Sequence, residues 1–145
     1  MKILVASDGS TSSLHAVKYA AKLVGKLSST SNSITLISVH DDTGMRLAMA
    51  FVGHKAVADY LRELSEKELK PARKILDGAG PNRITHDVEI RSGHIAQEIV
   101  SCAKKGRFDL IVMGAKGRGA IADILLGSVA QRVLATAEVP VVLVK

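Results

Sequence analysis

Glycine, serine and basic residues gather between positions 114 and 128, where the sequence reads GAKGRGAIADILLGS. Glycines let a ligand approach the backbone N–H groups closely, and a serine hydroxyl and cationic side chains favour an anion. These residue types therefore indicate phosphate binding. The same glycines also suit a simple turn followed by a helix, so the composition of the segment leaves both interpretations open.

Two common phosphate-binding motifs do not fit the segment. A P-loop requires G-x-x-x-x-G-K-[ST], but the Gly25-Lys26 pair is followed by Leu27 and lies inside a helical pattern. The dinucleotide fingerprint G-x-G-x-x-G/A matches residues 117–122 by letter. It lacks the acidic residue expected about 20 positions later, which would bind the ribose.

A third spacing, G-x2-G-x9-G-[ST], joins Gly114 and Gly117 to Gly127-Ser128. The first two glycines would turn the chain at the carboxyl end of a strand, the edge where open parallel sheets bind ligands. The second pair would begin a helix whose free N–H groups and dipole attract a phosphate. Lys116 and Arg118 would add positive charge. This spacing predicts a two-part phosphate cradle.

The elements that would position this cradle alternate along the chain. Short apolar runs predict strands at 2–7, 34–39, 84–90, 109–113 and 139–144. Apolar residues at helical spacing predict helices that begin near Ser10 or Ser12 and that span 55–78, 95–106 and 128–137. Segment 40–54 has no clean period and is expected to be a long surface connection. The alternation predicts one α/β domain over residues 1–145, with an open five-stranded parallel sheet and helices on both faces.

Composition narrows the class of protein further. With 47% hydrophobic but only 3% aromatic residues, the core must be aliphatic, as in sheets covered on both faces. The single Cys102 excludes an internal disulfide and is expected on the apolar side of a helix. No apolar run suggests a membrane span or a signal peptide, so we expect a cytoplasmic protein without a membrane partner. The net charge of +6 suits an anionic ligand, but no aromatic residue sits in a basic cluster, which argues against nucleic acid.

Other polar residues give weaker indications of chemistry. His40-Asp41-Asp42 follow the second predicted strand, but no histidine at ligand spacing supports a metal site, and we interpret them as a solvated turn. No set of nucleophile, base and orienting residue is visible beside the glycines. The sequence therefore favours binding over efficient catalysis.

Three segments, KILVASDGS, DLIVMGAKGRG and LLGSVAQRVLATAEVPVVLVK, resemble the universal stress protein family, and the resemblance extends over the whole chain. The G-x2-G-x9-G-[ST] spacing marks the nucleotide-binding branch of that family. The resemblance implies a Rossmann-like sheet of order 3-2-1-4-5 with ATP between the ends of strands 1 and 4. It also implies a homodimer along the last strand, Val139–Lys145, whose apolar edge would otherwise be unpaired.

The resemblance further implies roles for individual residues. Asp8 would contact the ribose or help to hold Mg²⁺ or Mn²⁺ beside the phosphates, and the backbone of Val39 would meet the adenine. The predicted binding set is Ala6, Ser7, Asp8, Val39, Met113, Gly114, Lys116, Gly117, Gly127, Ser128 and Val129. Two positions depart from the family pattern, since Ala115 lacks a common hydroxyl and Asp123 replaces a common basic residue.

The function that the resemblance implies is that of an ATP-binding, dimeric stress-response module whose conformation or partner depends on the nucleotide. AMP and ADP would fit the same site. Two alternatives stay open: a slow metal-dependent ATPase or self-phosphorylating enzyme with a metal near Asp8, and a dimeric scaffold without nucleotide. Turnover with Mg²⁺ or Mn²⁺ and its response to Asp8→Ala would identify the enzyme, and the identity of any nucleotide released from the denatured protein is the most informative single observation, since its absence would favour the scaffold.

Overall fold

Five parallel strands form one sheet in the order β3-β2-β1-β4-β5. The computed structural model describes residues 1–27, 31–43, 45–79, 84–118 and 126–145. The strands are β1 (Lys2–Ala6), β2 (Ser33–His40), β3 (Thr85–Ser92), β4 (Leu110–Gly114) and β5 (Val141–Val144). This order confirms the predicted fold class, and it reverses direction between β1 and β4, where α/β sheets open a crevice for ligands.

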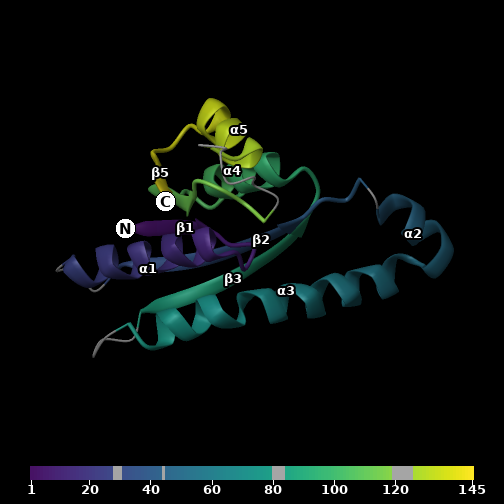
Figure 1. Ribbon diagram of the computed structural model, residues 1–145, viewed down its shortest axis with the longest axis horizontal. Coiled ribbons are helices and arrows are strands. Elements are labelled where there is room, and N and C mark those ends of the chain that lie inside the picture. Colours follow the sequence, from purple (N-terminus) through teal and green to yellow (C-terminus); the bar gives the residue numbers. More distant parts are fainter. Residues whose placement is uncertain (28–30, 44, 80–83, 119–125) are drawn as a thin grey trace.

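Two apolar layers enclose the sheet because side chains alternate along each strand. Ile3 and Val5 of β1 are fully buried against α1 (Thr11–Lys26) and α3 (His54–Asp77). Leu4, between them in sequence, is buried on the opposite face against α4 (Ile95–Lys105) and α5 (Ser128–Thr136). Figure 1 shows these two helix pairs on opposite sides of the sheet.

The predicted position of Cys102 is also confirmed. Its side chain lies in the apolar layer under α4 and is only 2% exposed. Burial raises the pKa of the thiol, so the neutral form is favoured. Within the described part of the chain, no helix has the length and apolar character needed to cross a membrane.

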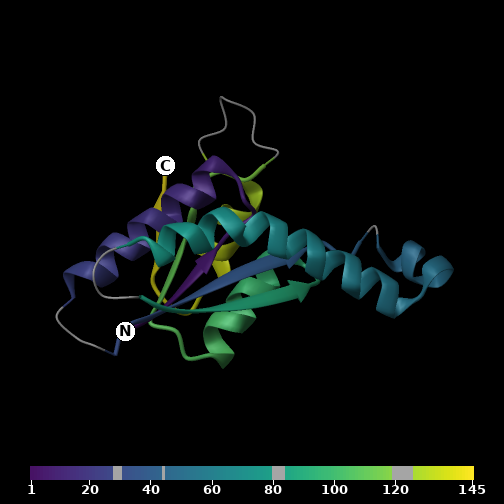
Figure 2. The same ribbon diagram turned by 90° about the horizontal axis from the view of Figure 1, so that it is seen from below.

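The prediction of an irregular connection over residues 40–54 is wrong, because α2 (Met45–Val52) lies within it. Methionine, leucine and alanine favour a helix, but only Arg46 in this segment is charged, so no polar face revealed the helical period. After Gly53 the chain continues directly into α3. Both views show α2 and the first half of α3 extending as an arm beyond the sheet, with Phe51 81% exposed near its tip (Figures 1 and 2).

Close packing of α1 on β4 requires the glycine at position 114. A Cβ added to Gly114 would lie 2.5 Å from Ser12 Oγ and 2.8 Å from the carbonyl carbon of Ser12. Because the second atom belongs to the backbone of α1, a side-chain rotation cannot relieve the clash. Gly114 therefore sets the distance between the helix and the end of the strand.

We expect Gly114→Ala to lower the free energy of unfolding by about 1–3 kcal/mol, since the helix must shift to admit the methyl group. Gly25→Ala is the matched control, because a Cβ there meets nothing within 4 Å and alanine favours the helix that contains it. Urea unfolding of both variants and the wild type measures the difference. Equal stability of the two variants would contradict the packing argument.

Candidate functional site

A cavity of about 600 Å³ opens at the carboxyl ends of β1, β2 and β4, next to the start of α5. This volume lies in the range of small-molecule sites. All of the predicted binding residues line this one cavity: Ala6, Ser7, Asp8, Val39, Met113, Gly114, Lys116, Gly117, Gly127, Ser128 and Val129. Their association with a nucleotide stays a prediction, but their placement around a single space is a property of the fold.

The start of α5 forms one wall of the cavity. Gly127 occupies the N-cap position and has no side chain that could cap the helix. Its carbonyl accepts the first intrahelical hydrogen bond, from the N–H of Gln131 at 3.0 Å. The N–H groups of Ser128, Val129 and Ala130 therefore have no acceptor within the helix. All three residues line the cavity, where the helix dipole adds positive potential. This wall is suited to an anion.

The loop after β4 forms the opposite half of the predicted cradle. The backbone of Ala115 holds it in place, since its N–H donates to Val144 O and its carbonyl accepts from Gly127 N, each at 2.8 Å. Among the described residues, a Cβ added to Gly117 would have only Asp8 Oδ2, at 3.5 Å, within 4 Å. Protein packing thus explains glycine at position 114 but leaves open space beside Gly117, next to a residue of the cavity wall.

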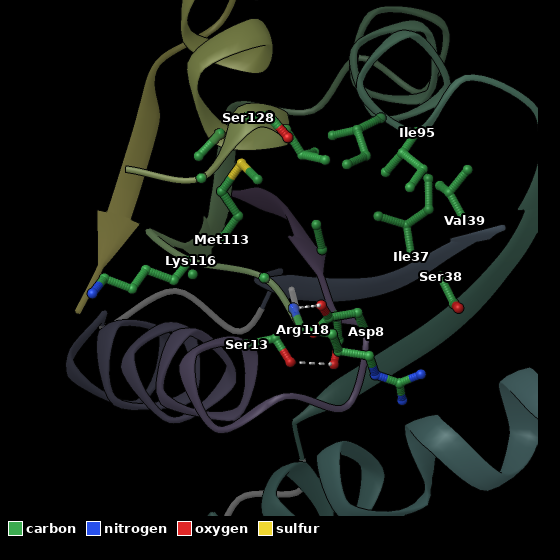
Figure 3. A pocket seen from close by; sticks show the side chains of 18 of the residues that line it. Asp8, Ser13, Ile37, Ser38, Val39, Ile95, Met113, Lys116, Arg118 and Ser128 are labelled. Atoms are coloured by element: carbon green, nitrogen blue, oxygen red, sulfur yellow. Dashed lines mark hydrogen bonds between the residues drawn. The ribbon is translucent and has the colours of Figure 1, made fainter. Parts of the chain in front are cut away.

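The other end of the cavity is apolar. Figure 3 shows Ile37, Val39 and Ile95 gathered on one side of the pocket, with Met113 and Ser128 across from them. Leu126 and Ile99 complete this lining. The isoleucines lie in segments that the sequence predicts as a strand and a helix, and their contact with the site was not predicted. Their position offered a signal, because β2 ends and α4 begins at the ligand-binding edge of the sheet.

Asp8 lies where this apolar slot meets the cradle, and backbone donors hold its carboxylate. The N–H of Ser10 donates to Oδ1 at 3.0 Å, and the N–H of Arg118 donates to Oδ2 at 3.2 Å. Burial by itself would raise the pKa of Asp8. The hydrogen bonds from Ser10, with smaller contributions from Ser13 and the Arg118 N–H, together outweigh this effect of burial. They hold the pKa of Asp8 below its ordinary value of 3.8. The site therefore contains a negative charge at neutral pH.

The two basic side chains do not point into the cradle as the sequence suggested. Arg118 Nη1 lies 2.6 Å from Oε1 of Glu68, a residue of α3 that sequence reasoning did not include in the site. The Lys116 side chain extends toward β5, away from Asp8 (Figure 3). In this conformation the positive potential of the cradle comes from backbone N–H groups.

The last residue of β2 contacts α3, and the residue after it contacts its own loop. His40 Nε2 lies 2.6 Å from Ser65 Oγ of α3, and Asp41 accepts hydrogen bonds from the N–H and the hydroxyl of Thr43. Within the described ranges, no group of three or more histidine, cysteine or acidic residues is arranged to hold a metal ion. Gly119 and Asp123, which entered the sequence interpretation, lie outside those ranges.

Comparisons with known proteins extend over the entire chain. A profile of the Universal stress protein family matches residues 1–145. The universal stress protein MJ0531 of Methanocaldococcus jannaschii is 33% identical over 144 residues, which cover 99% of this chain and 81% of that protein. The structure of hypothetical protein MJ0577 superposes with a TM-score of 0.84 at 27% identity, covering 99% of this chain and 94% of that one.

A more distant structure contains a ligand. The universal stress protein family protein At3g01520 of Arabidopsis thaliana, solved with AMP bound, superposes with a TM-score of 0.61. Its identity is 20%, and the match covers all of this chain and 91% of that one. At this identity the likeness supports the fold.

We expect Asp8→Asn to lower the free energy of unfolding at pH 7 by about 1–2 kcal/mol, because two N–H donors lose an ionised acceptor. Since the folded-state pKa of Asp8 lies below 3.8, its stabilising contribution is complete above that pH and is lost as the pH falls through the folded-state value. Urea unfolding at pH 7 and pH 3 should show the variant and wild type converging in acid. Asp59→Asn, at an exposed position of α3, is the control. A difference that persists unchanged at pH 3 would contradict the assignment.

Proposed function

The chain belongs to the universal stress protein family, and we propose that it is an ATP-binding member whose dimer acts as a nucleotide-dependent stress-response module. The observation that carries this proposal is the composition of the cavity at the strand ends. One end is an apolar slot, the other is the open N-terminus of α5, and an ionised carboxylate lies between them. A nucleotide has the same sequence of parts: a flat base, a polar sugar and anionic phosphates.

The proposed orientation follows from this match. Adenine lies in the apolar slot against the backbone of Val39, and Met113 and Gly114 line the ribose side. The phosphates lie between Gly117 and the N–H groups of Ser128 and Val129, where a helix N-terminus is a good anion site. The AMP-bound structure of At3g01520 supports an adenine nucleotide as the class of ligand. ADP and AMP fit the same cavity with fewer phosphates.

A divalent cation fits this arrangement as a companion of ATP. Both Asp8 oxygens already accept an N–H, but each carboxylate oxygen has a second lone pair available for a metal. Mg²⁺ usually binds through one or two carboxylates together with substrate phosphates, and retains several waters. Bound there, Mg²⁺ or Mn²⁺ would neutralise charge between Asp8 and the phosphates. A single protein carboxylate is therefore sufficient.

The proposed dimer forms along β5. This strand is an edge of the sheet and pairs only with β4, and each of its four residues remains partly exposed. An unpaired apolar edge favours the addition of another strand, and a second copy of the chain offers the same edge. The segment Val139–Lys145 would then form the contact between two copies.

We expect Gly117→Val to weaken ATP binding by about tenfold or more, equivalent to about 1.4 kcal/mol, because its side chain would enter the space beside Asp8. Gly25→Val, on the exposed face of α1, is the control and should bind as the wild type does. Calorimetric titration with ATP and Mg²⁺ measures both. Unchanged affinity in Gly117→Val would refute the cradle, and wild-type protein that binds no nucleotide would favour the scaffold alternative.

Phosphate release with Mg²⁺ or Mn²⁺ addresses the enzymatic alternative in the same samples. A binding module should show no turnover above the spontaneous rate. Turnover that disappears in Asp8→Ala would identify the protein as a slow ATPase with its metal at that carboxylate.

We expect Val141→Lys to convert the dimer to a monomer, because it places a charge from each copy in an apolar strand edge that the contact would bury. Light scattering after size-exclusion chromatography measures the mass. Val52→Lys is the control, since it places the same charge on the α2–α3 arm, where the side chain is 62% exposed. A Val141→Lys variant that remains dimeric would exclude this edge as the interface.

A further inference from the structure

Three charged side chains meet on the wall of the cavity beside α3. Arg118 is linked to Asp8 through its backbone N–H and to Glu68 through its guanidinium group. All three residues line the cavity. The wall thus holds two carboxylates and one cation, and that cation directly follows Gly117 of the proposed phosphate cradle.

The two partners in the Arg118–Glu68 pair differ in their freedom. The Glu68 side chain is 8% exposed, whereas that of Arg118 is 55% exposed. Gly9 permits this close arrangement, because its φ of +76° suits glycine and an added Cβ would lie 3.1 Å from Arg118 Nη2 and 3.2 Å from Glu68 O. Glu68 is therefore fixed by its surroundings, while the exposed arginine can rotate toward another acceptor.

We propose that Arg118 selects nucleotides by their number of phosphates, because the terminal phosphates compete with the Glu68 carboxylate for its guanidinium group. This inference rests on the proposed function and names the residue pair that tunes it. Arginine binds carboxylate and phosphate with the same planar, bidentate geometry, so the two acceptors are interchangeable partners. An added phosphate raises the negative charge in the cavity and draws the guanidinium away from α3.

The exchange has an opposing cost that sets the selectivity. Once Arg118 leaves, the nearly buried Glu68 carboxylate has lost its cation, and a buried charge without a partner is strongly unfavourable. The Glu68 carboxylate therefore lowers the affinity for nucleotides whose phosphates require Arg118. It does not change the affinity for ligands that lack phosphate. The contact of His40 with Ser65, one helical turn before Glu68, holds α3 to β2 independently of this exchange.

The test is a calorimetric titration of adenosine, AMP, ADP and ATP, each with Mg²⁺, into the wild type, Glu68→Gln, Arg118→Gln and the double variant. Glu68→Gln should bind ATP about three- to tenfold more tightly and adenosine within about twofold of the wild type. Arg118→Gln should weaken the binding of ATP by a similar factor and leave the affinity for adenosine unchanged. In the Arg118→Gln background, Glu68→Gln should alter ATP affinity by less than about twofold.

Glu66→Gln is the matched control. It removes the same charge from the same helix and breaks an ion pair of 2.9 Å with Arg73, but Glu66 does not line the cavity. Its ATP affinity should equal that of the wild type. A gain in ATP affinity for Glu66→Gln would show only general charge repulsion and would overturn the proposal. The same conclusion would follow if Glu68→Gln raised ATP affinity equally with and without Arg118.

Arg118→Gln provides an independent result if Glu68→Gln does not fold. Equal losses for adenosine and ATP in Arg118→Gln would make the arginine a structural residue and would also overturn the proposal. Wild-type protein that binds none of the four ligands would instead refute the proposed function. Binding that is insensitive to Arg118 refutes the selection and leaves the proposed function standing.

Discussion

The peptide groups on either side of one small residue hold the candidate site together. The N–H of Ala115 donates to Val144 at the end of β5, and its carbonyl accepts the N–H of Gly127 at the start of α5. Two bonds of 2.8 Å thereby join the loop after β4, the edge strand β5 and the N-terminus of α5. The second bond places the start of α5 next to the loop after β4, and the N-terminal residues of the helix line the cavity there. The absence of a side-chain hydroxyl at Ala115 does not affect that contact, because the contact uses only backbone atoms.

The electrostatic character of the site differs from that of the whole chain. The net charge of +6 suggests a basic ligand site, yet the charged group on the cavity wall consists of the carboxylates of Asp8 and Glu68 and of Arg118, which is paired with Glu68. The positive potential arises from the first N–H groups of α5. Such groups have fixed directions and lose no side-chain entropy when they meet an anion. The backbone therefore provides the phosphate cradle, and the side chains adjust it.

Much of the fold could be predicted from the sequence because local patterns specify it. β1 and β4 are apolar runs with turn residues at their ends, and Ser10 has the sequence context of a helix cap, which the structure confirms with a bond of 3.2 Å from Ser13 N to its hydroxyl. The cradle glycines were found for the same reason, since their spacing is local. Glu68 was missed because its partner Arg118 lies 50 residues away, and no local pattern indicates that α3 passes over the strand ends. α2 was missed because a nearly uniform apolar segment shows no period.

The position of Glu68 along α3 relates the ion pair at the cavity to the arm formed by α2 and the start of α3. Fourteen residues separate Glu68 from His54 at the start of α3, which corresponds to about 21 Å at a rise of ~1.5 Å per residue. From Ser65 onward α3 lies against the sheet, since Ser65 contacts His40 of β2 and the residues beyond Glu68 reach the core, whereas the start of α3 extends past the sheet with α2 at its tip (Figure 2). Glu68 therefore lies on the wall of the cavity, close to the point where α3 leaves the sheet. At this distance, a difference of about 5° in the direction of the helix corresponds to about 2 Å at its start.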